Sequence, residues 1–167
     1  MLSLLWLIFV FVLSVVLHEL AHAFAVKASG FEVDAIRFGL GKPIRKWRWN
    51  DIEISIGYPA TLAVAAVEYS DRGRGTIPQK IFIAAAGVLA NVALMVLADK
   101  ADSDPHLHAA SNYWALLGVA NLIIVVINLL PISFRRYNAY TKQWSDGGII
   151  LGLLQEQFTG RNFTERR

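Results

Sequence analysis

The chain of 167 residues is 55% hydrophobic and only 17% charged, whereas a typical soluble domain carries about 25% charged residues. Its formal net charge of +3 would permit nucleic-acid binding, but the basic residues cluster between apolar runs, which favours one side of a membrane instead. The absence of cysteine excludes disulfides and thiolate ligands, so any bound metal must be held by histidines and carboxylates.

Three apolar runs are long enough to cross a hydrocarbon core, which takes about 20 residues. They cover approximately residues 2–26, 77–98 and 113–132. A shorter apolar patch predicts a helix at about 146–157 that packs against the others or lies at the interface. The first run has no basic n-region and no A-x-A-like cleavage site, so we expect it to be a retained span and not a signal peptide. The length of the chain predicts one domain over residues 1–167.

A β-rich insert is predicted between the first two spans, at about residues 31–68. Three isoleucines alternate with polar residues at 52–56, and W-N-D at 49–51 is typical of a tight turn. The expected fold is therefore a mainly α-helical membrane protein with three spans and a small sheet of three or four strands. Trp47 and Trp49 also suit the aromatic belt of a membrane interface.

The distribution of lysine and arginine predicts the orientation. The segment between the second and third spans holds only Lys100, beside three aspartates, whereas the two flanking segments are basic. The positive-inside rule then places the N-terminus outside and both basic segments in the cytoplasm, as a multi-pass protein of the cell membrane. The basic residues are Lys27, Arg37, Lys42, Arg45, Lys46, Arg48, Arg72, Arg74 and Lys80, then Arg135, Arg136 and Lys142.

The first span ends in H-E-L-A-H at residues 18–22, a match to H-E-x-x-H. On a helix, His18 and His22 share a face and can bind one metal ion, for which zinc is suited. Glu19 can then act on a water as general base. The alternative is a pair of satisfied core histidines beside a charge, but three ionisable groups on a membrane helix are costly without a function.

A catalytic zinc site needs a third protein ligand, and the candidates are His106, His108, Glu68 and Asp146. The two histidines belong to a polar loop on the predicted outer side, and Glu68 suits a surface or packing charge. Asp146 lies on the predicted cytoplasmic side, where the first span also ends, and the glycine pair after it permits close backbone approach. Asp-Gly-Gly is also typical of a plain turn or helix start.

Together these motifs resemble the site-2 protease family, the intramembrane zinc metalloproteases. The likeness extends from the N-terminus to about residue 154, and four motifs in order carry it: HELAH (18–22), GVLAN (87–91), NLLP (128–131) and SDGG (145–148).

The resemblance implies a core of three transmembrane helices with a sheet inserted after the first, and one Zn²⁺ per chain. It implies that zinc is bound by His18, His22 and Asp146, with Glu19 as the catalytic base. Two asparagines match positions for substrate binding or transition-state support, Asn91 and Asn128. Hydrogen bonding between helices is the alternative for both, and for Asn121 it is the favoured role.

Two positions depart from the family pattern. Val88 stands where the second motif usually has proline. The spacing from Pro131 to Asp146 is also longer than in the family's compact motif, and the extra residues read as an insertion.

The expected activity is hydrolysis of peptide bonds within or near transmembrane segments of membrane proteins, inside a lipid bilayer and without nucleic acid. A strand edge of the inserted sheet, with Ile54 as an edge residue, is expected to hold the unwound substrate. Association with further copies of the chain, as a homo-oligomer, or with a regulatory membrane partner is also possible from the sequence. The rival is a catalytically inactive relative that binds a metal or a helix, and an unrelated membrane zincin using Glu68 is a further alternative.

Overall fold

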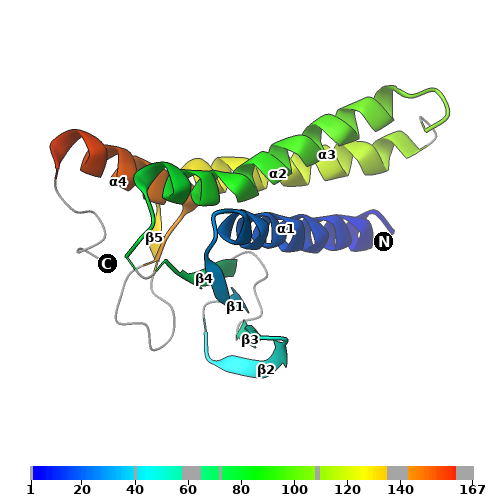
Figure 1. Ribbon diagram of the computed structural model, residues 1–167. Helices are drawn as coiled ribbons and strands as arrows, with labels where there is room; N and C mark the ends of the chain where they lie inside the picture. Colours follow the sequence, from blue (N-terminus) through cyan, green and yellow to red (C-terminus); the bar gives the residue numbers. More distant parts are fainter. Residues whose placement is uncertain are drawn as a thin grey trace.

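The computed structural model describes residues 2–39, 41–57, 65–71, 73–107, 110–134 and 143–160. Three long helices lie side by side: α1 (Leu2–Ala28), α2 (Ile77–Ser103) and α3 (Ser111–Leu129) (Figure 1). Each is long and apolar enough to cross a membrane. A four-stranded sheet is inserted between α1 and α2, so the expected fold class is confirmed.

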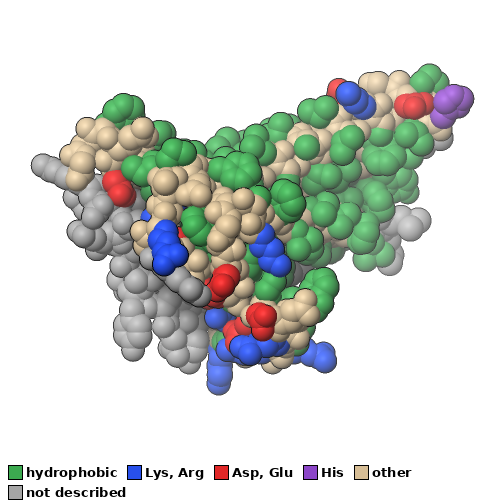
Figure 2. Space-filling view, viewed as in Figure 1, with side chains coloured by type: hydrophobic (Ala, Val, Ile, Leu, Met, Phe, Trp, Pro, Cys, Tyr) green, Lys and Arg blue, Asp and Glu red, His purple; other side chains and the backbone are tan. Residues whose placement is uncertain are grey.

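The outward surface of the helices is apolar, with exposed side chains that include Leu5, Phe24 and Leu97 (Figure 2). Small and polar residues such as Ser14 and Gly87 are buried between the helices instead. In water this distribution would be unfavourable, but in a bilayer it faces apolar side chains to lipid and lets helix backbones approach closely.

Local sequence signals explain where the helices begin and end. Thr76 and Gln79 form a capping box at the start of α2, so two backbone N–H groups of the first turn are satisfied. The helix α3 ends at Leu129, three residues before the expected boundary, because the residue before a proline is disfavoured in helical conformation. Leu130, which precedes Pro131, is accordingly extended, with φ −66° and ψ 133°.

The sheet consists of β1 (Glu32–Phe38), β2 (Pro43–Trp49), β3 (Ile52–Gly57) and β4 (Ala65–Ser70), in the order β2-β3-β1-β4. β1 and β3 pair in parallel, and the other pairs are antiparallel. The predicted turn joins β2 to β3, with Asn50 at a φ of 51°. Val33 and Ile36 of β1 pack with Ala25 and Val26 of α1, which anchors the sheet beside the end of the first helix.

The expected edge position of Ile54 is wrong. β3 lies between β2 and β1, and Ile54 is paired with Trp47 on one side and Ile36 on the other. Within the part of the sheet that the structure describes, the edge strands are β2 and β4.

The chain returns to the end of α3 before the last helix begins. β5 (Ser133–Phe134) pairs antiparallel with β6 (Gln143–Trp144), and α4 (Asp146–Thr159) follows directly. Ser145 N–H then donates to the carbonyl of Ile132, at 2.9 Å. The longer spacing between Pro131 and Asp146 therefore does not carry the aspartate away from α3.

The two ends of the helix group differ in what they carry. The N-terminus and the α2–α3 connection lie at one end, whereas the sheet, β5 and α4 lie at the other (Figure 1). Charged side chains gather over the sheet (Figure 2). The orientation in the membrane stays a prediction, and four of the basic residues used for it lie outside the described residues: Arg72, Arg135, Arg136 and Lys142.

Candidate metal centre

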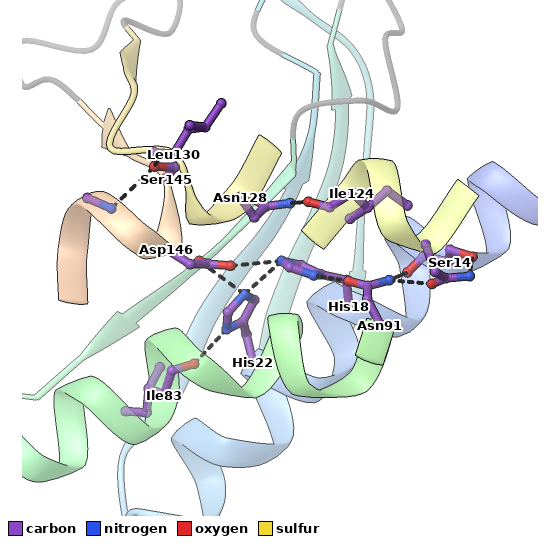
Figure 3. Close-up of polar contacts among 12 residues, drawn as sticks. Ser14, His18, His22, Ile83, Asn91, Ile124, Asn128, Leu130, Ser145 and Asp146 are labelled. Atoms are coloured by element: carbon purple, nitrogen blue, oxygen red, sulfur yellow. Dashed lines mark hydrogen bonds and ion pairs between the residues drawn. The ribbon is translucent and has the colours of Figure 1, made fainter. Parts of the chain in front are cut away.

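Two helices supply the three candidate metal ligands. His18 and His22 lie one turn apart on α1, and Asp146 is the first residue of α4. Because α4 packs against α2 and α3, its first turn reaches the histidines across the helix group (Figure 3). All three residues are buried, with exposed fractions between 4% and 8%.

The candidate ligand atoms lie within 4.8 Å of one another, close enough to share one metal ion. His18 Nε2 lies 3.0 Å from His22 Nε2 and 3.1 Å from Asp146 Oδ2. His22 Nε2 lies 3.3 Å from Asp146 Oδ1. With Zn–N and Zn–O bonds of about 2.0–2.1 Å, neighbouring ligand atoms of a tetrahedron lie about 3.3 Å apart. One zinc ion can therefore reach all three residues from this arrangement.

The other ring nitrogens are held by acceptors outside the site. His22 Nδ1 lies 2.6 Å from the carbonyl oxygen of Ile83, and His18 Nδ1 lies 2.5 Å from Asn91 Oδ1. A carbonyl oxygen only accepts, so His22 Nδ1 carries a proton and Nε2 is the ring nitrogen available to a metal. Metal-binding histidines usually have such a partner behind them.

Asp146 is ionised at neutral pH. Burial raises the pKa of Asp146, but the contacts with His18 and His22 lower it by a larger amount. The net result is a pKa of about 2. A carboxylate is the form that binds a metal, and a bound cation would lower the pKa in the same direction.

The start of α4 is fixed against the end of α3. The hydroxyl of Ser145 accepts from the N–H of Ile132 at 3.1 Å and from the N–H of Gly148 at 3.3 Å, and donates to the carbonyl of Leu130. A Cβ on Gly147 would lie only 2.5 Å from the carbonyl carbon of Leu129. The glycine and the capping serine therefore let Asp146 approach the histidines.

Gly87 of α2 leaves room at the centre. A Cβ at this position would lie 2.5 Å from His18 Nε2, and closer still to His22 Nε2. The two Nε2 atoms are thus open toward α2 only because residue 87 has no side chain. Gly87 belongs to the GVLAN motif, and its position four residues before Asn91 was the available sequence signal for a role at the centre.

The remaining candidates lie in different places. Glu19 is buried on α1 beside His18 in the chain. Asn91 touches His18, whereas the Asn128 amide donates to the Ile124 carbonyl of its own helix, at 3.0 Å. The catalytic role of Glu19 and the substrate roles of the two asparagines stay predictions.

Two of the alternative third ligands, Glu68 and His106, are not brought to the histidines. Glu68 forms an ion pair with Arg37 in the sheet, at 2.7 Å. His106 is exposed beyond the end of α2, and His108 lies outside the described residues. Among the described residues, the group that can hold a metal is His18, His22 and Asp146.

Comparison with known proteins decides the family. The family model of peptidase family M50 matches residues 6–99, which is more than half of the chain. The chain belongs to peptidase family M50. A search of curated proteins finds no match.

Membership of the M50 family, the site-2 protease family, supports a metallopeptidase in a membrane, and the family is generally zinc-dependent. The matched range includes both histidines, Glu19, Gly87 and Asn91, but ends before Asp146. The case for the aspartate in this M50 protein therefore comes from the geometry of α4.

A methyl group at residue 87 tests the open centre. We expect Gly87→Ala to leave the folded protein with little bound zinc, because the new Cβ occupies the space between the imidazoles. The measurement is metal content after zinc loading, with helicity by circular dichroism. Gly118→Ala is the matched control, since its Cβ would make only an ordinary contact of 3.9 Å with Ala98. Normal zinc content in Gly87→Ala would contradict the placement of the site.

Proposed function

We propose that this protein is an intramembrane zinc metalloprotease that hydrolyses peptide bonds within or near transmembrane segments of other membrane proteins. The observation that carries the proposal is the convergence of His18, His22 and Asp146 between three apolar helices. A buried group of ionisable side chains in such helices is costly unless it has a function. Membership of the M50 family supports the reaction type.

The chemistry divides between the metal and Glu19. A zinc ion bound by the three ligands would polarise the scissile carbonyl and lower the pKa of a water to about 7. Glu19 would take the proton of the attacking water and pass it to the leaving amine, since it follows His18 directly on α1. Its burial keeps this carboxylate within the helix group rather than in solvent.

The substrate segment must unwind before it can be cleaved, because a transmembrane helix satisfies its own backbone hydrogen bonds. An exposed strand edge would hold the unwound segment by β-addition. With Ile54 in the interior of the sheet, β2 is the better edge for this role, because all its residues are exposed whereas those of β4 are half-buried.

The proposed setting is the cell membrane, with the N-terminus outside and the centre opening to the cytoplasm. The centre lies toward the same end of the helices as the sheet and its basic residues, as the positive-inside rule requires of a cytoplasmic site (Figure 1). The partners are then the bilayer and a transmembrane protein substrate, and not a nucleic acid.

Glu19→Gln separates an enzyme from a non-catalytic relative. We expect cleavage of a transmembrane fusion substrate to fall by about 10²–10⁴-fold, because the general base is removed. Zinc content should stay at one per chain, because Glu19 is not among the three metal ligands. The control is Glu32→Gln, an exposed position on β1. Unchanged cleavage in Glu19→Gln would favour a metal-binding or helix-binding regulator.

Asp146→Ala tests the third ligand against Glu68. We expect Asp146→Ala to lose zinc after dialysis against a weak chelator, whereas Glu68→Ala should retain it, because Glu68 is paired with Arg37 in the sheet. Metal analysis of both purified variants gives the answer. Loss of zinc in Glu68→Ala alone would favour Glu68 as the third ligand.

Cysteine cross-linking tests the substrate edge, since the chain has no cysteine of its own. We expect Trp47→Cys on β2 to form a disulfide with a cysteine placed near the scissile bond of the fusion substrate. Phe158→Cys on α4, which is also exposed, should not. Equal cross-linking at both positions, or none at β2, would argue against β-addition at this strand.

A further inference from the structure

A chain of buried amide groups extends from His18 into the middle of the helix group (Figure 3). Asn91 of α2 contacts His18, Asn121 of α3 contacts Asn91, and Ser14 of α1 contacts both asparagines. Ser14, Asn91 and Asn121 are each 0% exposed. Three helices thus each contribute one polar residue to a cluster that does not itself bind the metal.

The orientation of the Asn121 amide follows from a backbone group. Asn121 Nδ2 donates to the carbonyl of Leu117, at 2.8 Å, and to Ser14 Oγ, at 3.0 Å. A carbonyl oxygen cannot donate, so the NH₂ group of Asn121 must face Leu117. Its oxygen is therefore turned toward Asn91.

The orientation of Asn91 follows in turn. Asn91 Nδ2 donates to Asn121 Oδ1 at 2.7 Å, and to the carbonyl of Ser14 at 3.4 Å. Both partners only accept, so Asn91 must present its NH₂ to them and its oxygen to His18. That oxygen also only accepts, which places a proton on His18 Nδ1 and leaves Nε2 as the ring nitrogen available to a metal.

We propose that Asn121, supported by Ser14, is a positioning residue that selects the metal-binding tautomer of His18 through Asn91. The inference rests on the proposed metal site. His22 needs no such relay, because the carbonyl of Ile83 fixes its tautomer directly. If Asn91 were flipped, its NH₂ would face His18 Nδ1 and the proton would move to Nε2, the atom that must bind the metal.

The test compares variants at Asn121 that differ in acceptor capacity but not much in size. Asn121→Leu removes the acceptor, whereas Asn121→Asp retains an oxygen for Asn91 and, when protonated, a donor for Leu117. Asn128→Leu is the matched control, since Asn128 lies two turns further along α3 and bonds within its own helix. The readouts are zinc affinity by chelator competition and the histidine tautomers by ¹⁵N NMR of metal-free, detergent-solubilised protein.

We expect Asn121→Leu to weaken zinc binding by about 10–100-fold, the usual effect of losing a group that orients a metal ligand. The His18 signal should show loss of the Nδ1–H form, while His22 is unchanged. Asn121→Asp should keep the zinc affinity and the His18 tautomer close to those of the parent, and Asn128→Leu should leave them unchanged. Ser14→Ala should have a smaller effect than Asn121→Leu.

Two results would overturn the proposal. One is an Nδ1–H tautomer and zinc affinity like the parent's in Asn121→Leu. The other is an equal loss of affinity in Asn121→Leu and Asn128→Leu, which would indicate packing rather than orientation. If the parent itself bound no zinc, the proposed function would fail, and the tautomer of His18 in the metal-free protein would still test the relay by itself.

Discussion

Lipid offers no hydrogen bonds, so every polar group buried among the helices must find its partner inside the protein. This constraint governs the middle of the molecule. The imidazole of His22 uses a backbone carbonyl, and that of His18 uses Asn91, whose own amide is satisfied by α1 and α3. What remains at the centre is a group of two ring nitrogens and a carboxylate, which can hold a cation.

Close approach of helices is the second requirement, and two glycines meet it. Gly87 brings the backbone of α2 against the two imidazoles, and Gly147 brings α4 against the last turn of α3. At both positions even one methyl group would have to displace a metal ligand or a backbone carbonyl. The site thus depends on absent side chains as much as on present ones.

Much of this could be predicted from the sequence, because lipid enforces simple rules. The lengths of the apolar runs identified the membrane spans, and the H-E-x-x-H motif on a helix placed His18 and His22 on one face. The parallel pairing that puts Ile54 inside the sheet was not predictable, since alternation gives strands but not their order. The link from His18 to Asn121 was also missed, because spacing along one helix says nothing about contacts between helices. Ser14, four residues before His18 on α1, was the one available signal.

The β5–β6 pair fixes where the connection from α3 to α4 ends, whatever its length. The strands bring the chain back to α3 on either side of the eight residues 135–142, and Ser145 then bonds to Ile132. The position of the aspartate is therefore set by the paired strands and by the bond from Ser145 to Ile132, and not by the number of residues between Phe134 and Gln143.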